Sequence, residues 1–364
     1  MRAADPIEPT MPSDPRSFRT EVLRKAARIE RSRRRTRAAA WALGFVVVAV
    51  SVTALLRHPV ARTAAPGAAT DVLQVRAFRP PATRTPYAVA TGADGAVWVT
   101  EDPAAPGAPA AIVRLDGDGD TTTYVLPTGA RPAGITAGAD GALWYVDPGR
   151  GVLGRITTAG VQRTWPTPAP PGPSIAVDAN GSLWFTEPTR DSIGHMTLGG
   201  TISQLPLPHG AIPGIVAEGP DGTVWLSETN AGMVAQVEAT GALSDFPLPA
   251  AQRVTALTTG PGPAIWLAAS DGTRNWVGYL DGDGRIVEQP AGAAEIDALS
   301  LAADGQLWFA GPTSASLASA LTSGVAIHRL AGDVHPDSIT GLPDGSLWIV
   351  DRQQSVIDAT TATG

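Results

Sequence analysis

GADGAVWVTE, at residues 92–101, is a ten-residue segment that returns at a regular interval along the chain. The tryptophans of its seven copies are 40 to 46 residues apart, so the segment belongs to a structural repeat. The other copies are GADGALWYVD at 138–147, DANGSLWFTE at 178–187, GPDGTVWLSE at 219–228, GPGPAIWLAA at 260–269, AADGQLWFAG at 302–311 and LPDGSLWIVD at 342–351. The repeated residues are Trp98, Trp144, Trp184, Trp225, Trp266, Trp308 and Trp348, whereas Trp165 and Trp276 fall outside the pattern.

Each repeat contains four short segments typical of β-strands. In the second copy, residues 133–137 form a strand-like segment of alternating pattern that leads to a tight Ala-Asp-Gly turn. Residues 143–146 form the second strand-like segment after this turn. Residues 152–157 follow, and a polar outer strand ends near Pro166. Asp-Gly between alternating apolar segments is a strong hairpin signal, and four antiparallel strands at this period predict a β-propeller blade. We expect each repeated tryptophan to pack between adjacent blades.

The end of the chain predicts how the ring of blades closes. After Trp348 there is room for a second strand and a third strand near residues 355–359, and then the chain ends. We expect residues 72–78 (VLQVRAF) to supply the missing outer strand, because pairing of chain start and chain end removes an open edge. The predicted fold is all-β, a seven-bladed β-propeller over residues 72–364.

Charge divides the chain into two parts. Residues 1–37 hold eleven basic and five acidic residues, a net charge of +6, whereas the remainder holds 16 basic and 29 acidic residues, a net charge of −13. An acidic body argues against a nucleic-acid partner. The chain has no cysteine, which excludes disulfides, thiol nucleophiles and cysteine-ligated metal sites.

Residues 38–56 (AAAWALGFVVVAVSVTALL) form an uncharged apolar segment. A helix of this length spans about 28 Å, close to the thickness of the hydrocarbon core of a bilayer. The eight basic residues at 24–37 predict a cytoplasmic N-terminus, a single-pass signal anchor in the cell membrane and an extracytoplasmic propeller. An Ala/Pro/Gly-rich linker at 57–71 connects the two. A cleaved signal peptide is the alternative, although the basic leader and the apolar segment are both longer than usual.

Two consecutive segments, GITAGADGALWYVD at 134–147 and GVLGRIT at 151–157, closely resemble the streptogramin lyase (virginiamycin B lyase) family. Residues 178–187 and 191–197 resemble it as well, and the resemblance covers essentially everything after the linker. It implies a seven-bladed propeller that opens a cyclic depsipeptide antibiotic by metal-assisted elimination. It assigns this chemistry to two histidines that open the innermost strands of blades six and seven, and to a glutamate before the second histidine.

The matching positions in this chain lie eleven residues before each repeated tryptophan. They hold Tyr87, Ala133, Pro173, Gly214, Thr255, Asp297 and Asp337. The resemblance thus implies that both histidine positions are aspartates and that His335 stands at the glutamate position, while Tyr87 keeps a side chain that the family uses near its site. We name Tyr87, Asp297, His335 and Asp337 as candidate catalytic residues and Thr255 as a candidate ligand-binding residue.

The two aspartates change the chemistry that this site would perform. A carboxylate with a pKa of about 3.9 is a much weaker base than imidazole near neutral pH. Asp297 and Asp337 could raise each other's pKa, or could hold Mg²⁺ or Ca²⁺ together with water. His335 could serve as the base from the neighbouring position.

Acidic residues also recur three positions after the repeated tryptophan. In a propeller these positions share a face with the starts of the innermost strands, so they could surround one mouth with negative potential and bind a ligand. The alternative is that they accept hydrogen bonds from backbone amides or from arginines such as Arg155 inside each blade. The five residues are Glu101, Asp147, Glu187, Glu228 and Asp351.

Three functions remain open from the sequence. The favoured one is an extracytoplasmic, membrane-anchored propeller that binds a ligand or protein partner in sensing or at the envelope. The second is a divergent carbon–oxygen lyase that uses the residues of the mouth, and the third is a structural scaffold. An antibiotic-inactivating lyase would be expected in the cytosol, which argues against the second.

Overall fold

The computed structural model describes residues 72–361, except 118, 209, 220, 239–240, 249–251, 261–263, 282–283, 291–295, 303–304, 312–315, 322–323 and 331–333. The predicted basic segment (1–37), signal anchor (38–56) and linker (57–71) lie outside the described residues. Within the described part of the chain, no helix is both long enough and apolar enough to cross a membrane.

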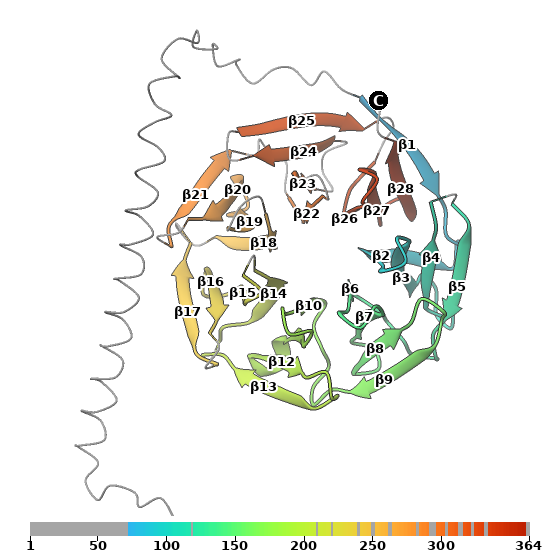
Figure 1. Ribbon diagram of the computed structural model, residues 1–364, viewed down its shortest axis with the longest axis horizontal. Helices are drawn as coiled ribbons and strands as arrows, with labels where there is room; N and C mark the ends of the chain where they lie inside the picture. The colour runs from blue at the N-terminus through green and yellow to red at the C-terminus, as the bar shows by residue number, and fades with distance from the viewer. Residues whose placement is uncertain are drawn as a thin grey trace, which may run out of the picture. The chain divides into compact units, whose positions relative to one another are not determined.

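The described residues form seven antiparallel blades around a common centre (Figure 1). Blade one contains β2 (Arg84–Thr91), β3 (Val97–Pro103), β4 (Ala111–Leu115) and β5 (Thr121–Val125). Blade two contains β6 (Ile135–Ala137), β7 (Leu143–Asp147), β8 (Val152–Ile156) and β9 (Gln162–Pro166). Blade three contains β10 (Ile175–Val177), β11 (Leu183–Glu187), a 3-10 turn η1 (Pro188–Arg190), β12 (Ser192–Met196) and β13 (Ile202–Pro206).

The remaining blades repeat the same order of strands. Blade four contains β14 (Pro213–Glu218), β15 (Val224–Glu228), β16 (Met233–Val237) and β17 (Leu243–Pro247). Blade five contains β18 (Arg253–Thr259), β19 (Ile265–Ser270), β20 (Asn275–Leu280) and β21 (Ile286–Pro290). Blade six contains β22 (Ala298–Leu301), β23 (Leu307–Ala310), β24 (Ser316–Leu321) and β25 (Gly324–Leu330). Blade seven contains β26 (Ser338–Gly341), β27 (Leu347–Asp351), β28 (Val356–Thr361) and β1 (Val72–Phe78).

The strand β1 closes the ring. It pairs antiparallel with β28, from Gln74 opposite Thr361 to Phe78 opposite Ile357. Its first two residues also pair in parallel with β25, so blades six and seven form one continuous eight-stranded sheet. The repeat pattern did not predict this second pairing, because it joins residues outside the seven tryptophan segments.

The repeated tryptophans pack between adjacent blades, which confirms the expected role. Trp98, for example, is fully buried in one cluster with Leu143 and Tyr145 of the next blade. Each repeated tryptophan also contacts a second ring of its own blade, with ring centroids 4.3 to 5.6 Å apart. These rings belong to Phe78, Tyr124, Trp165, His195, Phe246, Tyr279 and His328.

The two tryptophans outside the repeat pattern have separate structural positions. Trp165 is the outer ring of blade two, where it contacts Trp144. Trp276 is fully buried and donates its indole N–H to Gln252 Oε1 at 2.8 Å.

The ends of the strands define two faces of the propeller. Chain direction alternates within each blade, so the starts of the innermost strands and the loops between second and third strands lie on one side, the mouth face. The hairpin turns between first and second strands and between third and fourth strands lie on the other side, the turn face. Because β28 starts at the mouth face and β1 runs antiparallel to it, Val72 lies at the turn face.

Candidate functional site

The position eleven residues before the repeated tryptophan lies at a β-bulge in three blades. The pairing of β2 with β3 skips Tyr87, between Pro86 and Ala88. The pairing of β18 with β19 skips Thr255 in the same way, and the β14 pairing is shifted around Gly214. Bulges redirect side chains out of the strand ladder and are frequent next to active sites. The matched residue is therefore placed by the same backbone irregularity in blades one, four and five.

Residues of blades one and seven meet at the mouth face in what we call the junction cluster: Tyr87, His335, Asp337, Asp351 and Arg352. The Arg352 guanidinium lies over the ring of Tyr87, with its carbon 4.3 Å from the ring centroid. The Arg352 amide donates to Asp337 Oδ2 at 2.8 Å. The His335 amide donates to Asp351 Oδ2 at 2.8 Å, and His335 Nδ1 lies 3.6 Å from the same oxygen.

The environment of Asp337 favours its neutral form. Partial burial raises the pKa of this carboxyl, and the nearby Asp351 adds to the effect. The Arg352 amide and charge and His335 act in the opposite direction, and the net result is a raised pKa. A carboxylate with a raised pKa is a stronger base, so burial offsets part of the weakness expected from aspartate at this position.

Asp297 and Thr255 lie in the neighbouring blades six and five. The Asp297 amide donates to the Ala310 carbonyl at 3.0 Å, and its side chain is exposed. Thr255 is half-buried, and its Oγ1 is shielded from solvent without a hydrogen-bond partner among the described residues. An orphaned hydroxyl at a bulge is a polar group for which a ligand could supply the missing partner.

The described residues fit a divalent cation poorly. They contain no group of three or more His, Asp or Glu side chains arranged to hold a metal ion. One oxygen of Asp337 already accepts the Arg352 amide, and the guanidinium beside it repels a cation. The proposed Mg²⁺ or Ca²⁺ site at Asp297 and Asp337 stays a prediction, and we derive no step through a metal.

The five recurring acids are buried at the ends of the second strands. Asp147 accepts the amides of Arg131 and Arg150, at 2.8 and 3.2 Å. Glu187 accepts from Ser192 Oγ at 3.0 Å and from Gln204, and Asp351 accepts the amides of His335 and Gln354. The amides on Asp147 and Asp351 are contacts that the structural alternative predicts, whereas the partners of Glu187 are two side chains. The role of these acids toward a ligand stays a prediction.

The other two acids have different surroundings. Glu101 is fully buried with Arg84, whose Nε lies 3.2 Å from Oε2, and burial raises the Glu101 pKa to about 6 against the effect of Arg84. Burial also raises the pKa of Glu228, with Asp245 adding to the shift, and Glu228 Oε1 has no hydrogen-bond partner among the described residues. Arg84 thus gives Glu101 the arginine contact that the structural alternative predicts, whereas Arg155 Nε donates to Asp140 in a hairpin turn at 2.6 Å.

Arg352 is the residue of the junction cluster that the sequence did not reveal. It directly follows Asp351, where blade one has Asp102 and blade two has Pro148. A cation at this position in one blade only is a break in the repeat, and such breaks are the signal that could have identified it.

Comparisons with known proteins agree with this architecture. The Virginiamycin B lyase family model matches residues 73–359. One similar solved structure is a catalytically inactive histidine-to-alanine variant of virginiamycin B lyase from Staphylococcus aureus with quinupristin. Its sequence is 24% identical to this chain, and the match covers 79% of this chain and 99% of that one, with a TM-score of 0.70. A streptogramin B lyase structure is 25% identical over 79% and 97% of the two chains, with a TM-score of 0.70.

A more distant match shows the fold alone. It is YCF48 bound to D1 peptide, 15% identical over 81% of this chain and 99% of that one, with a TM-score of 0.62. No match was found among curated protein sequences. Because the family model spans nearly all of the propeller, the chain belongs to the virginiamycin B lyase family.

Proposed function

We propose that this protein is a membrane-tethered, extracytoplasmic propeller that binds a ligand or protein partner at its mouth face, without the lyase reaction of its family. The observation that carries the proposal is the contact of Arg352 with Tyr87 and Asp337. It places a ring, a cation and a carboxyl group within one small area. A site of this kind can bind a peptide-like ligand, which presents apolar groups, amide donors and carbonyl acceptors together.

The loss of lyase activity rests on the two matched histidine positions, which hold Asp297 and Asp337. In the S. aureus relative, a single histidine-to-alanine change is described as leaving the enzyme catalytically inactive. The imidazole base that the resemblance implies is absent from both positions here, and the backbone amide of Arg352 already donates to one of the two aspartates. Binding can survive such changes, because it does not require a base with a pKa near neutrality.

The tether is supported by the apolar segment 38–56 and by the basic residues before it. Linker residues 57–71 lead to Val72, at the turn face of the propeller. In this proposal the chain therefore enters at one face and the junction cluster opens at the other. The net charge of −13 beyond residue 37 favours a partner other than nucleic acid.

The test uses the full-length chain in detergent, with quinupristin as the probe. Calorimetry measures binding, and mass spectrometry of the same samples measures opening of the depsipeptide ring. We expect saturable binding without turnover, and a loss of affinity of about tenfold in Arg352→Gln. Arg285→Gln, which removes the same charge from an exposed side chain between β20 and β21 at the turn face, is the matched control and should bind normally. Turnover that disappears in Asp337→Ala would overturn the proposal.

That last outcome would establish the second candidate, a divergent lyase. The observation that favours it is the raised pKa of Asp337, because a partly buried carboxyl is a better base than a solvated one. A titration with Mg²⁺ alone, in the wild type and in Asp297→Asn, tests the predicted metal site separately. Failure of quinupristin, Mg²⁺ and Ca²⁺ to bind would favour the third candidate, a scaffold.

A further inference from the structure

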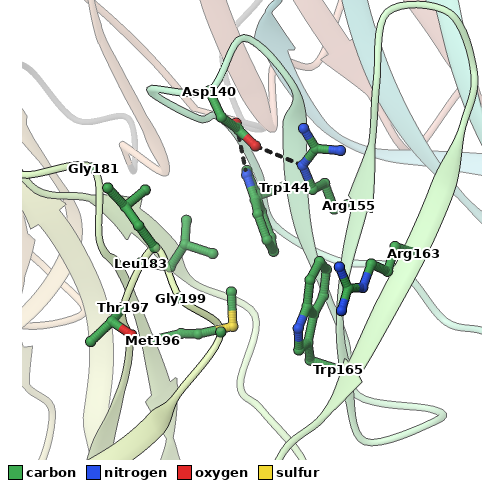
Figure 2. Close-up of a pocket in the computed structure, with 12 residues that line it drawn as sticks. Asp140, Trp144, Arg155, Arg163, Trp165, Gly181, Leu183, Met196, Thr197 and Gly199 are labelled. Carbon is green, nitrogen blue, oxygen red and sulfur yellow. Dashed lines mark hydrogen bonds and ion pairs between the residues drawn. The ribbon is translucent and has the colours of Figure 1, made fainter.

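A cavity of about 270 Å³ lies between blades two and three. We call it the indole pocket (Figure 2). Asp140 and Gly181 contribute to it from hairpin turns between first and second strands, and residues 197–200 contribute the turn between β12 and β13. The pocket is therefore on the turn face, whereas Asp147, at the other end of β7, lies at the mouth face. It is separate from the site discussed above.

One wall of the indole pocket consists of two tryptophans. Trp144 and Trp165 have ring centroids 4.9 Å apart and planes inclined by 33°. In the other six blades the repeated tryptophan meets a smaller ring, so an indole pair occurs in blade two alone among the seven ring contacts. Gly200 lies against Trp165, and a Cβ there would approach the indole Nε1 within 3.0 Å.

The facing wall is apolar and comes from blade three. Leu183 and Met196 are buried there, and Figure 2 shows their side chains across the cavity from the two indoles. Leu198, 71% exposed, lies at the rim. An aromatic wall opposite an apolar wall is suited to a flat ring, which would contact π-faces on one side and aliphatic groups on the other.

The charged side chains of the pocket leave one positive charge that is not neutralised. Asp140 accepts from Trp144 Nε1 at 3.1 Å and from Arg155 Nε at 2.6 Å. Burial alone would raise the pKa of Asp140, but these hydrogen bonds outweigh it and hold the pKa below its ordinary value. The carboxylate is therefore ionised, and Arg155 neutralises it.

Arg163 supplies the positive charge that remains. Its guanidinium carbon lies 4.6 Å from the Trp165 ring centroid, and its side chain is exposed. It forms no ion pair with an acidic side chain of the described residues. A guanidinium fixed on an aromatic face presents its remaining N–H donors in the geometry that a carboxylate accepts.

From these contacts we infer that the indole pocket binds a small aromatic carboxylate. The ring stacks against Trp165 and the apolar wall, and the carboxylate accepts hydrogen bonds from Arg163. The volume limits the ligand to one or two fused rings, because drug-sized ligands occupy pockets of about 300 to 1,000 Å³. Aromatic compounds with a protonated alkylamine group are excluded, since they would place a cation beside Arg163.

The test is a calorimetric titration of the full-length chain in detergent with indole-3-acetate. Two analogues serve as comparison ligands. Indole-3-acetamide has the same indole ring with a neutral amide in place of the carboxylate, and tryptamine has the same ring with a cationic ammonium group. We expect saturable binding of the acid with a dissociation constant of about 1 mM or tighter, and binding at least about tenfold weaker for both analogues. Equal binding of acid and amide, or no saturation by the acid at about 10 mM, would overturn the inference.

Two variants locate the site. Arg163→Gln should lower the affinity for the acid about tenfold and leave the affinity for the amide unchanged. Arg190→Gln, at an exposed arginine of η1 outside the pocket, removes the same charge and should change neither. Trp165→Tyr, which recreates the Trp–Tyr pair of blade one, should weaken both ligands, and its circular dichroism spectrum checks folding. Unchanged acid binding in Arg163→Gln would place the ligand elsewhere and contradict the inference.

Discussion

Asp358 lies on β28 with its side chain 4% exposed. Burial raises its pKa to about 6, Asp351 adds to the shift, and Arg79 opposes it. Because the folded state then binds a proton more tightly than the unfolded state, the free energy of unfolding rises as the pH falls from about 7 toward 5. A single group with this shift contributes about 1 kcal/mol over that range.

We therefore expect Asp358→Asn to flatten the dependence of stability on pH by about 1 kcal/mol between pH 7 and pH 5. Urea unfolding of wild type and variant at both pH values measures the difference. Asp120→Asn removes a charge of the same sign from an exposed side chain and should keep the wild-type profile. Identical slopes in wild type and Asp358→Asn would show that this carboxyl does not titrate as described.

Gly194 occupies the third strand of blade three, where the ring of Phe185 lies directly over it. A Cβ at this position would overlap the ring, whereas a Cβ on Gly199 would have Thr197 Oγ1 as its nearest neighbour, at 3.8 Å. We expect Gly194→Ala to lower the free energy of unfolding by about 1–3 kcal/mol, because the core has no room for the methyl group. Gly199→Ala is the matched control, and equal urea midpoints for the two variants would contradict this account.

At the scale of single residues, the sequence predicted positions better than contacts. The fixed spacing of eleven residues before each repeated tryptophan identified the positions of Tyr87 and Asp337, because the strand ladder fixes the spacing within a repeat. It did not predict that Arg352 joins them, since that contact crosses from blade seven to blade one and depends on a residue without counterparts in other repeats. Backbone amides were one alternative for the partners of Asp147 and Asp351, but no side-chain pattern reveals which amides these are.

At the scale of elements, β1 carries the closure of the ring. Phe78 stacks on Trp348 with ring centroids 5.1 Å apart and planes inclined by 20°, as Tyr124 stacks on Trp98 in blade one. The repeat period predicted this strand, because blade seven lacks a fourth segment of its own. The parallel pairing of Val72 and Leu73 with β25 could not be predicted, since it needs no hydrophobic pattern and follows from the proximity of two blade edges.

Phe78→Ala tests how much this strand stabilises the propeller. Loss of a partly buried ring from the core of blade seven should cost about 2–4 kcal/mol and lower the urea midpoint of the full-length chain. Val125→Ala, on the outer strand β5 with 57% of the side chain exposed, is the control and should cost less than about 0.5 kcal/mol. A Phe78→Ala protein as stable as the control would mean that backbone pairing alone closes the ring.

At the scale of the whole molecule, the predicted anchor has a consequence that can be measured, the side of the membrane on which the propeller lies. The sequence predicts a cytoplasmic segment with a net charge of +6 and an exterior body with a net charge of −13. The chain has no cysteine, so a single introduced thiol is a unique label. We expect Val125→Cys to react with a membrane-impermeant maleimide in bacterial spheroplasts, because β5 would face the outside.

Ser17→Cys, within the basic segment, should react only after the cells are lysed. Both variants should sediment with the membrane fraction, because the anchor is expected to remain uncleaved. Labelled propeller in the soluble fraction would instead identify 38–56 as a cleaved signal peptide. Protection of Val125→Cys in spheroplasts would place the propeller in the cytoplasm, where a family lyase would meet its antibiotic, and the argument from location against the second function would then fail.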